Sequence, residues 1–143
     1  MFTGRHYHNI EAKGRLAIPS DYREKLASGC VITVGLDGCL FLFPNSYWQQ
    51  LSEKLANLPL TNSQARQFVR LIIQQASEVS FDQQGRILIP DYLREKAQLQ
   101  KQTVVAGALT RIEIWDKQVY HTHLDLITQE NPNWEEGLSS LNI

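Results

Sequence analysis

The chain reads EAKGRLAIP at residues 11–19, and a closely similar stretch, DQQGRILIP, returns at residues 82–90. The second stretch begins 71 residues after the first, about half the length of this 143-residue chain. The likeness continues downstream, because Arg-Glu-Lys at residues 23–25 recurs at residues 94–96. A repeat on this scale determines the architecture before any local pattern does. The sequence therefore predicts two copies of one small unit, each with an acidic residue, a glycine turn and an arginine directly after the turn.

Each copy is expected to fold as strand, tight turn, strand, short helix, strand, turn and strand. In the second copy, Asp82 and Gly85 occupy the first and fourth positions of a four-residue stretch, which is typical of a type I turn closed by a left-handed glycine. The Asp82 carboxylate can then accept a hydrogen bond from a backbone N–H of the turn. Ile18 and Ile89 precede prolines, which favours extended backbone at both positions.

Helices are expected after each turn, between the copies and after the second copy. The two segments between the copies carry apolar residues at helical spacing, and Pro59 separates them. Beyond Glu130 the tail is polar and acidic. The expected N-caps are Ser20, Asn45, Thr61 or Asn62, and Asp91.

The composition is that of a soluble globular protein, with 43% apolar and 20% charged residues. No apolar run is long enough to span a bilayer and no signal-peptide pattern is present, so we expect a cytoplasmic protein with no membrane partner. Cys30 and Cys39 are then expected to be reduced thiols. The net charge is −1, but residues 1–25 carry +2 and residues 112–143 carry −5, so a polyanion should approach the N-terminal part of the chain.

Arg15 and Arg86 follow the two turns and are the main candidates for a binding role. Each could simply pair with the acid four residues earlier, Glu11 or Asp82. However, a repeated basic turn suits a repeated ligand, and arginine can bind a phosphate or a guanine edge through two hydrogen bonds. We expect the two acids to shape the turns and orient the arginines. Acid–base catalysis would require them to be close together and perturbed, which the sequence does not indicate.

A metal site is a further alternative, because His6 and His8 would share one face of a strand. No third histidine and no Cys-x-x-Cys motif lies nearby, so we expect neither metal nor cofactor. The sequence also lacks a phosphate-binding loop, a dinucleotide fingerprint and a nucleophile elbow. These observations argue against an enzyme.

Taken together, these motifs resemble those of the MraZ family over most of the chain, to about residue 120. The residues that carry the resemblance are residues 1–4, His8, residues 13–16, Pro19, residues 37–40, Trp48, Leu55, Leu58, Arg66, Arg70, and residues 82–90 and 113–115.

The resemblance implies an α+β fold, in which two pseudo-symmetric AbrB-like swapped-hairpin units share one β-rich core with intervening and C-terminal helices. It also implies a ring-shaped homo-oligomer that binds repeated sites on double-stranded DNA upstream of a division and cell-wall gene cluster and regulates transcription. We therefore expect a cytoplasmic, nucleoid-associated regulator rather than an enzyme. An AbrB-like antitoxin, or another protein-binding module that uses the acidic tail, is the alternative.

The resemblance assigns the two motif copies to Glu11–Arg15 and Asp82–Arg86, and the segments and DNA-binding residues are expected from the repeat and the resemblance together. The expected segments are a first DNA-binding unit at residues 5–47, a helical linker at 48–75, a second DNA-binding unit at 76–119, and a C-terminal helix with an acidic tail at 120–143. The expected DNA-binding residues are Arg5, Lys13, Gly14, Arg15, Gly85 and Arg86, and the two acids of the motif are Glu11 and Asp82. Because Gln84 stands where the first copy has Lys13, we expect the first copy to contribute more to phosphate binding.

Overall fold

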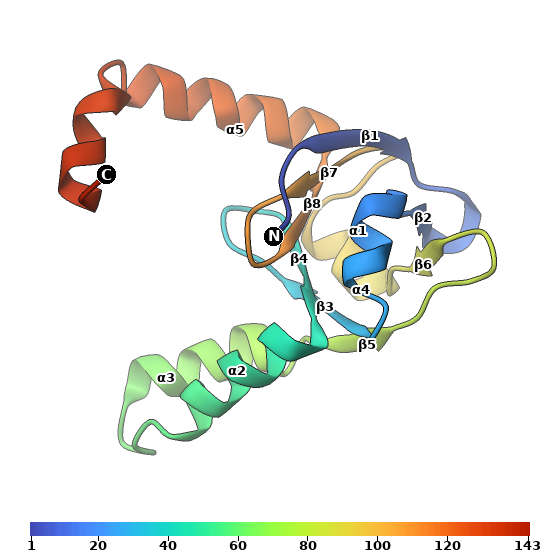
Figure 1. Ribbon diagram of the computed structural model, residues 1–143, viewed down its shortest axis with the longest axis horizontal. Coiled ribbons are helices and arrows are strands. Elements are labelled where there is room, and N and C mark those ends of the chain that lie inside the picture. The colour runs from blue at the N-terminus through green and yellow to red at the C-terminus, as the bar shows by residue number, and fades with distance from the viewer.

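The computed structural model describes residues 1–143 and contains eight β-strands and five α-helices (Figure 1). The strands are β1 (Arg5–Asn9), β2 (Arg15–Ala17), β3 (Cys30–Val34), β4 (Leu40–Pro44), β5 (Ser77–Val79), β6 (Arg86–Leu88), β7 (Gln102–Gly107) and β8 (Ile112–Asp116). The helices are α1 (Ser20–Lys25), α2 (Asn45–Ala56), α3 (Ser63–Phe68), α4 (Asp91–Lys96) and α5 (Lys117–Glu130).

The two repeats are interlocked by exchange of strands, which confirms the predicted swapped arrangement. β1 of the first repeat pairs with β7 of the second, and β5 of the second pairs with β3 of the first. β2 and β6 pair only with each other, with Leu16 opposite Ile87. The strands that flank each tight turn therefore belong to different sheets, and neither repeat could form its sheet alone.

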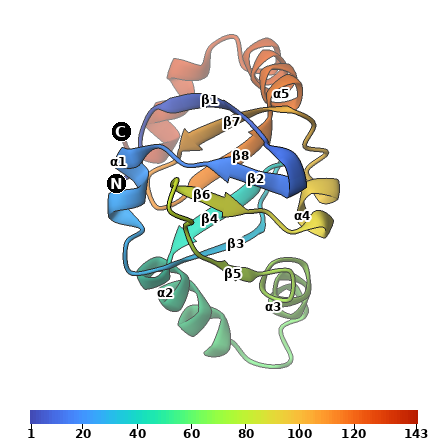
Figure 2. The ribbon, with the colours of Figure 1, turned by 90° about the vertical axis from the view of Figure 1, so that its right-hand side faces the viewer.

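The six-stranded antiparallel sheet has the order β1-β7-β8-β4-β3-β5. The order is symmetric about its centre, where β4 and β8 of the two repeats pair with Phe41 opposite Glu113. One face is covered by the β2–β6 pair together with α1 and α4, and this layer holds the larger apolar core. α2 and α5 pack on the other face around Phe41, Phe43 and Trp115. Figure 2 shows the β2–β6 pair in front of the sheet.

The central strands are buried, and the two cysteines lie within this buried region. Both Cys30 and Cys39 are free thiols, as expected. Burial raises the pKa of Cys30 to about 11 and raises the pKa of Cys39 further. The apolar residues 40–43 lie in the buried strand β4 and so belong to the core.

Three of the predicted N-caps are wrong. Helices α1, α2 and α4 begin at Ser20, Asn45 and Asp91, but a proline occupies the N-cap position before each of them and none has a side-chain cap. The proline ring fixes φ while its ψ stays extended, so the polar residue becomes the first helical residue. Asn62 does cap α3, because its side chain accepts a hydrogen bond from the Ala65 N–H at 3.0 Å.

Two parts of the chain extend away from the sheet on the left of Figure 1. α3 continues as a π-helical segment over Val69–Ile73, and with α2 it forms a projecting pair that we call the α2–α3 hairpin (residues 45–73). The other is α5, which is followed by a 3₁₀ segment over Trp134–Leu141. None of these helices is long and apolar enough to cross a membrane.

Candidate nucleic-acid interface

The two repeated turns lie at the end of the molecule farthest from the helical arms. We call residues 11–15 tip 1 and residues 82–86 tip 2. Each tip precedes one strand of the short antiparallel β2–β6 pair, so the two tips lie at its two ends, and their side chains meet across it. Both tips are on the right of Figure 1 and toward the viewer in Figure 2. The pairing also links each turn to the other repeat, because Gly14 O accepts from Ile89 N at 2.9 Å and Gly85 O accepts from Ile18 N at 3.1 Å.

Tip 2 has the predicted geometry. Asp82 Oδ1 accepts hydrogen bonds from the backbone N–H groups of Gln84 at 2.9 Å and Arg86 at 3.0 Å. Gly85 adopts a left-handed φ of 76°. The hydrogen bonds from the backbone and side chain of Arg86 and from the backbone of Gln84 lower the pKa of Asp82, and the bond from the Arg86 backbone has the largest effect. The carboxylate therefore fixes the turn in its charged form.

Tip 1 departs from this geometry at its first residue. The longer Glu11 side chain makes no capping hydrogen bond, and both Lys13 and Gly14 adopt left-handed φ values, of 68° and 89°. The expectation that Glu11 shapes its own turn is therefore wrong. The extra methylene carries the carboxylate past the turn and toward the other repeat.

The ion pairs also cross between the repeats. Arg86 is held by Asp82, at 2.9 Å from its Nε, and by Glu11 of tip 1. The hydrogen bonds that Arg86 donates to these two acids, first to Glu11 and then to Asp82, raise the pKa of Arg86. Arg15 makes one longer contact, 3.4 Å to Asp82, and does not pair with Glu11. The structure therefore places the acid beside the arginine of its own copy only in the second copy.

Two further arginines, for which no role was predicted, pack against the turns. Positions Gly14 and Gly85 are covered by the guanidinium groups of Arg94 and Arg23, each from the opposite repeat. A Cβ built on Gly14 would lie 2.7 Å from Arg94 Cζ, and one on Gly85 would lie 2.5 Å from Arg23 Nη1. The sequence contains a pattern that could have indicated this, because Arg23 and Arg94 recur at the same offset as the two turns.

The remaining candidates are divided between two faces of the molecule. Lys13 is exposed at tip 1 and makes no side-chain hydrogen bond or ion pair. Arg5, in contrast, lies on the opposite face of the sheet, where its Nη1 donates to Tyr120 of α5 at 3.2 Å. The structure therefore brings Lys13, Arg15 and Arg86 together and leaves Arg5 apart.

The histidines show no metal-site geometry. His6 packs edge-on against Tyr22 at 5.3 Å, and burial lowers the pKa of His8. No group of three or more His, Cys, Asp or Glu side chains is arranged to hold a metal ion. The two tips carry three cations, Lys13, Arg15 and Arg86, and two carboxylates, Glu11 and Asp82. The carboxylates pair with the two arginines, and Lys13 is exposed without a partner.

Comparison with known proteins agrees with this repeat. The family model described as "MraZ protein, putative antitoxin-like" matches the chain twice, at residues 1–71 and 72–136. The chain belongs to the MraZ family. MraZ relatives named "Transcriptional regulator MraZ" include those of Desulforamulus reducens, 49% identical over 82% of this chain and 83% of that protein, and Carboxydothermus hydrogenoformans, 46% identical over 86% of both. The MraZ protein of Pelotomaculum thermopropionicum is 44% identical over 100% of this chain and 99% of its own length.

Membership confirms the resemblance that the motifs indicated. MraZ proteins are transcriptional regulators, so the predictions of a transcription regulator and of a protein that is not an enzyme are confirmed at that level. The two matches also confirm that the chain is a tandem repeat, with the second match starting at residue 72.

Proposed function

We propose that this protein binds repeated sites on double-stranded DNA through its paired tips, upstream of the division and cell-wall gene cluster, as a ring-shaped homo-oligomer. The observation that supports this most directly is the placement of Lys13 and Arg15 beside Arg86 on one surface. A cationic surface made of two turns can enter a groove while its lysine and arginines bind phosphates or base edges. Binding in the cytoplasm at the nucleoid follows from this role.

The two arginines are proposed to have different tasks. Arg86 is held between two carboxylates, so that moving it to DNA would break both ion pairs. Arg15 has one contact at 3.4 Å and its side chain is 39% exposed, so it can turn toward a phosphate or a guanine at little cost. Together with Lys13, it makes tip 1 the stronger contact, and Arg86 mainly holds the two tips in register.

Assembly is part of this proposal, since one chain presents few cations and has a net charge of −1. Several weak contacts on one DNA molecule raise the overall affinity by multivalency. A ring that presents many tips to a series of repeats would provide this.

The test is binding of the purified protein to its own upstream DNA and to a scrambled sequence across a salt series. We expect preference for the upstream DNA and a steep loss of affinity with salt. Arg15→Ala should weaken binding more than Arg86→Ala, and Arg5→Ala serves as the comparison because its side chain lies on the other face of the sheet. Equal affinity for both DNAs at every salt concentration would refute the proposal.

The antitoxin alternative keeps one specific point in its favour, namely the acidic C-terminal part of the chain, with a charge of −5 over residues 112–143. Such a segment could occupy a basic protein partner. A stable partner that is captured by the full chain but lost on deletion of residues 129–143, in a protein that fails the DNA test, would support this alternative.

A further inference from the structure

The outward face of the β2–β6 pair carries apolar side chains as well as the arginines of both tips. In an antiparallel pair, residues directly opposite each other share one face, and neighbours along a strand alternate between the two faces. Leu16 and Ile87 are opposite each other and fully buried, so they form the inner face, which packs on the core. The outer face is made of two cross-strand pairs, each with one arginine and one apolar residue: Arg15 with Leu88, and Ala17 with Arg86.

Leu88 is the large apolar residue of this outer face, and it is 45% exposed. Its counterpart in the first repeat, 71 residues earlier, is the small and half-buried Ala17. A single exposed leucine is common on protein surfaces. Leu88 differs from such a residue in its position, because it lies directly opposite Arg15, the tip arginine that has only one long ion-pair contact. The leucine therefore belongs to the same surface as the proposed DNA contact.

The position of Leu88 means that DNA bound to Arg15 also covers it. The two tips lie at the two ends of the β2–β6 pair, so the outer face forms the floor between them (Figure 2). Side chains that are directly opposite in an antiparallel pair have Cβ atoms about 5 Å apart. A groove wall or base edge that reaches Arg15 therefore removes Leu88 from water. This burial is most favourable where the DNA offers an apolar group in return.

The base edges of DNA offer one such group. The C5-methyl group of thymine projects into the major groove, whereas the edges read in the minor groove are hydrogen-bond donors and acceptors. The major groove, about 12 Å wide, admits a two-stranded β-ribbon. The β2–β6 pair is a ribbon of this kind, with three residues in each strand and one face free of the core. Leu88 is thus placed to meet a thymine methyl group at the floor of the groove.

We propose that Leu88 contacts the C5-methyl group of thymine in the major groove and is a specificity-determining residue of the DNA-binding surface. This inference rests on the proposed DNA binding and adds a recognised base to it. The contact comes from the second repeat, while Arg15 of the first repeat binds beside it. Because Ala17 is too small to reach as far, the two halves of the outer face do not read DNA equally.

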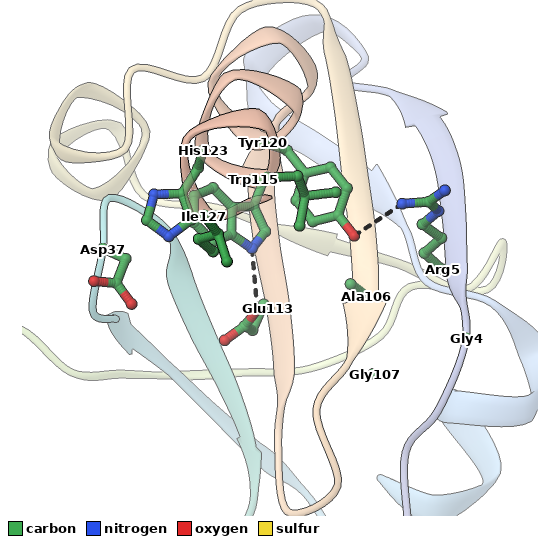
Figure 3. A pocket seen from close by; sticks show the side chains of 11 residues that line it. Gly4, Arg5, Asp37, Ala106, Gly107, Glu113, Trp115, Tyr120, His123 and Ile127 are labelled. Atoms are coloured by element: carbon green, nitrogen blue, oxygen red, sulfur yellow. Dashed lines mark hydrogen bonds between the residues drawn. The ribbon is translucent and has the colours of Figure 1, made fainter. Parts of the chain in front are cut away.

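The experiment compares two forms of the upstream DNA, one with thymine and one with deoxyuridine at every thymine position. Uracil lacks the methyl group but keeps the hydrogen-bonding groups of thymine. The full-length wild type and Leu88→Ala are titrated against both forms, and the ratio of the two dissociation constants is the readout. Two control variants are Leu36→Ala, at a leucine that is 56% exposed between β3 and β4, and Arg5→Ala. Arg5 lies on the other face of the sheet and donates to Tyr120 there (Figure 3).

We expect the wild type to bind the uracil form at least about fourfold more weakly, since burial of one methyl-sized group is worth about that factor. Leu88→Ala should bind both forms with nearly equal affinity, and both controls should keep the wild-type ratio. Circular dichroism verifies that each variant is folded. Equal binding of both forms by the wild type would overturn the inference. A folded Leu88→Ala that keeps the full wild-type ratio would also overturn it, because the methyl groups would then be read by another residue.

A scrambled duplex of the same thymine content separates this inference from the proposed function. A wild type that prefers its upstream DNA to the scrambled duplex, but binds the thymine and uracil forms equally, would remove the role of Leu88 and leave the DNA binding standing. A wild type with no preference for the upstream DNA at any salt concentration would refute the proposed function, and the role of Leu88 with it.

Discussion

At the scale of single residues, Asp82 connects the turn to the pair of arginines. Its carboxylate accepts two backbone N–H groups, contacts both Arg86 and Arg15, and has a lowered pKa in the folded protein. The charged form is therefore favoured by folding. Stability from this group is fully present above its ordinary pKa of 3.8 and is lost as the pH falls through the lower folded-state pKa.

We expect Asp82→Asn to unfold at a lower temperature than the wild type at pH 7, because the amide keeps an acceptor for the turn but loses both ion pairs. The difference should shrink over roughly pH 5 to pH 1 as the wild-type carboxylate is protonated. Glu11→Gln is the matched control, since the Glu11 carboxylate accepts no backbone hydrogen bond and its loss should have a smaller effect. Thermal unfolding of both proteins as a function of pH tests this prediction. A difference in unfolding temperature that grows toward low pH would contradict it.

The turn glycines give a second prediction at this scale. Gly14→Ala and Gly85→Ala each place a Cβ on left-handed backbone, which costs about 1–2 kcal/mol. Gly14→Ala should cost more, because the new Cβ would lie 2.9 Å from the backbone oxygen of Ile89, whereas at Gly85 the nearest atoms belong to the Arg23 side chain. Urea unfolding measures both, with Gly137→Ala as the control in open space. Equal losses at Gly14 and Gly137 would show that the turn is not constrained in this way.

At the scale of secondary-structure elements, the predictions from sequence succeeded where the interaction is local. Asp82 and the glycine three residues later determine their turn through hydrogen bonds within five residues, so the sequence pattern was sufficient. The caps at Ser20, Asn45 and Asp91 were predicted wrongly because the preceding prolines moved each helix start by one residue. The partner of Glu11 could not be predicted, because Arg86 reaches it only through the pairing of β2 with β6, 75 residues away in sequence.

The N-cap of α5, which was not predicted, supports a prediction about the stability of this helix. Asp116 is buried, and its Oδ2 accepts hydrogen bonds from the N–H groups of Gln118 and Val119 while its Oδ1 accepts from Gln100 N at 3.1 Å. Asp116→Ala removes the cap and leaves the Gln100 N–H unpaired, which together should cost about 2–3 kcal/mol. Ser20→Ala, at a helix start without a side-chain cap, should change stability by less than about 0.5 kcal/mol.

Chemical denaturation of Asp116→Ala and Ser20→Ala in parallel tests this difference in stability. Asp116→Asn should be intermediate, because its single amide oxygen can serve the helix or Gln100 but not both. If Asp116→Ala lost no more stability than Ser20→Ala, the three hydrogen bonds at Asp116 would be unimportant for holding α5 against the sheet.

At the scale of the whole molecule, the two tips and the helical arms lie at opposite ends. The strand exchange brings the tips together at one end, and the same topology sends the α2–α3 hairpin and α5 out at the other. A chain built in this way can bind a neighbour without covering its cationic tips. DNA affinity and assembly can then be altered separately, but they should be coupled through the number of tips that reach one DNA molecule.

The salt dependence of DNA binding measures the coupling between assembly and DNA affinity. Each phosphate neutralised contributes about −0.9 to the slope of log K against log salt concentration. If a single chain uses Lys13, Arg15 and Arg86, its slope should be no steeper than about −2.7. We expect the wild type to show a clearly steeper slope, because several chains bind one DNA molecule together. A wild-type slope no steeper than about −2.7 would mean that each DNA complex involves the tips of one chain only, and that assembly serves some purpose other than DNA affinity.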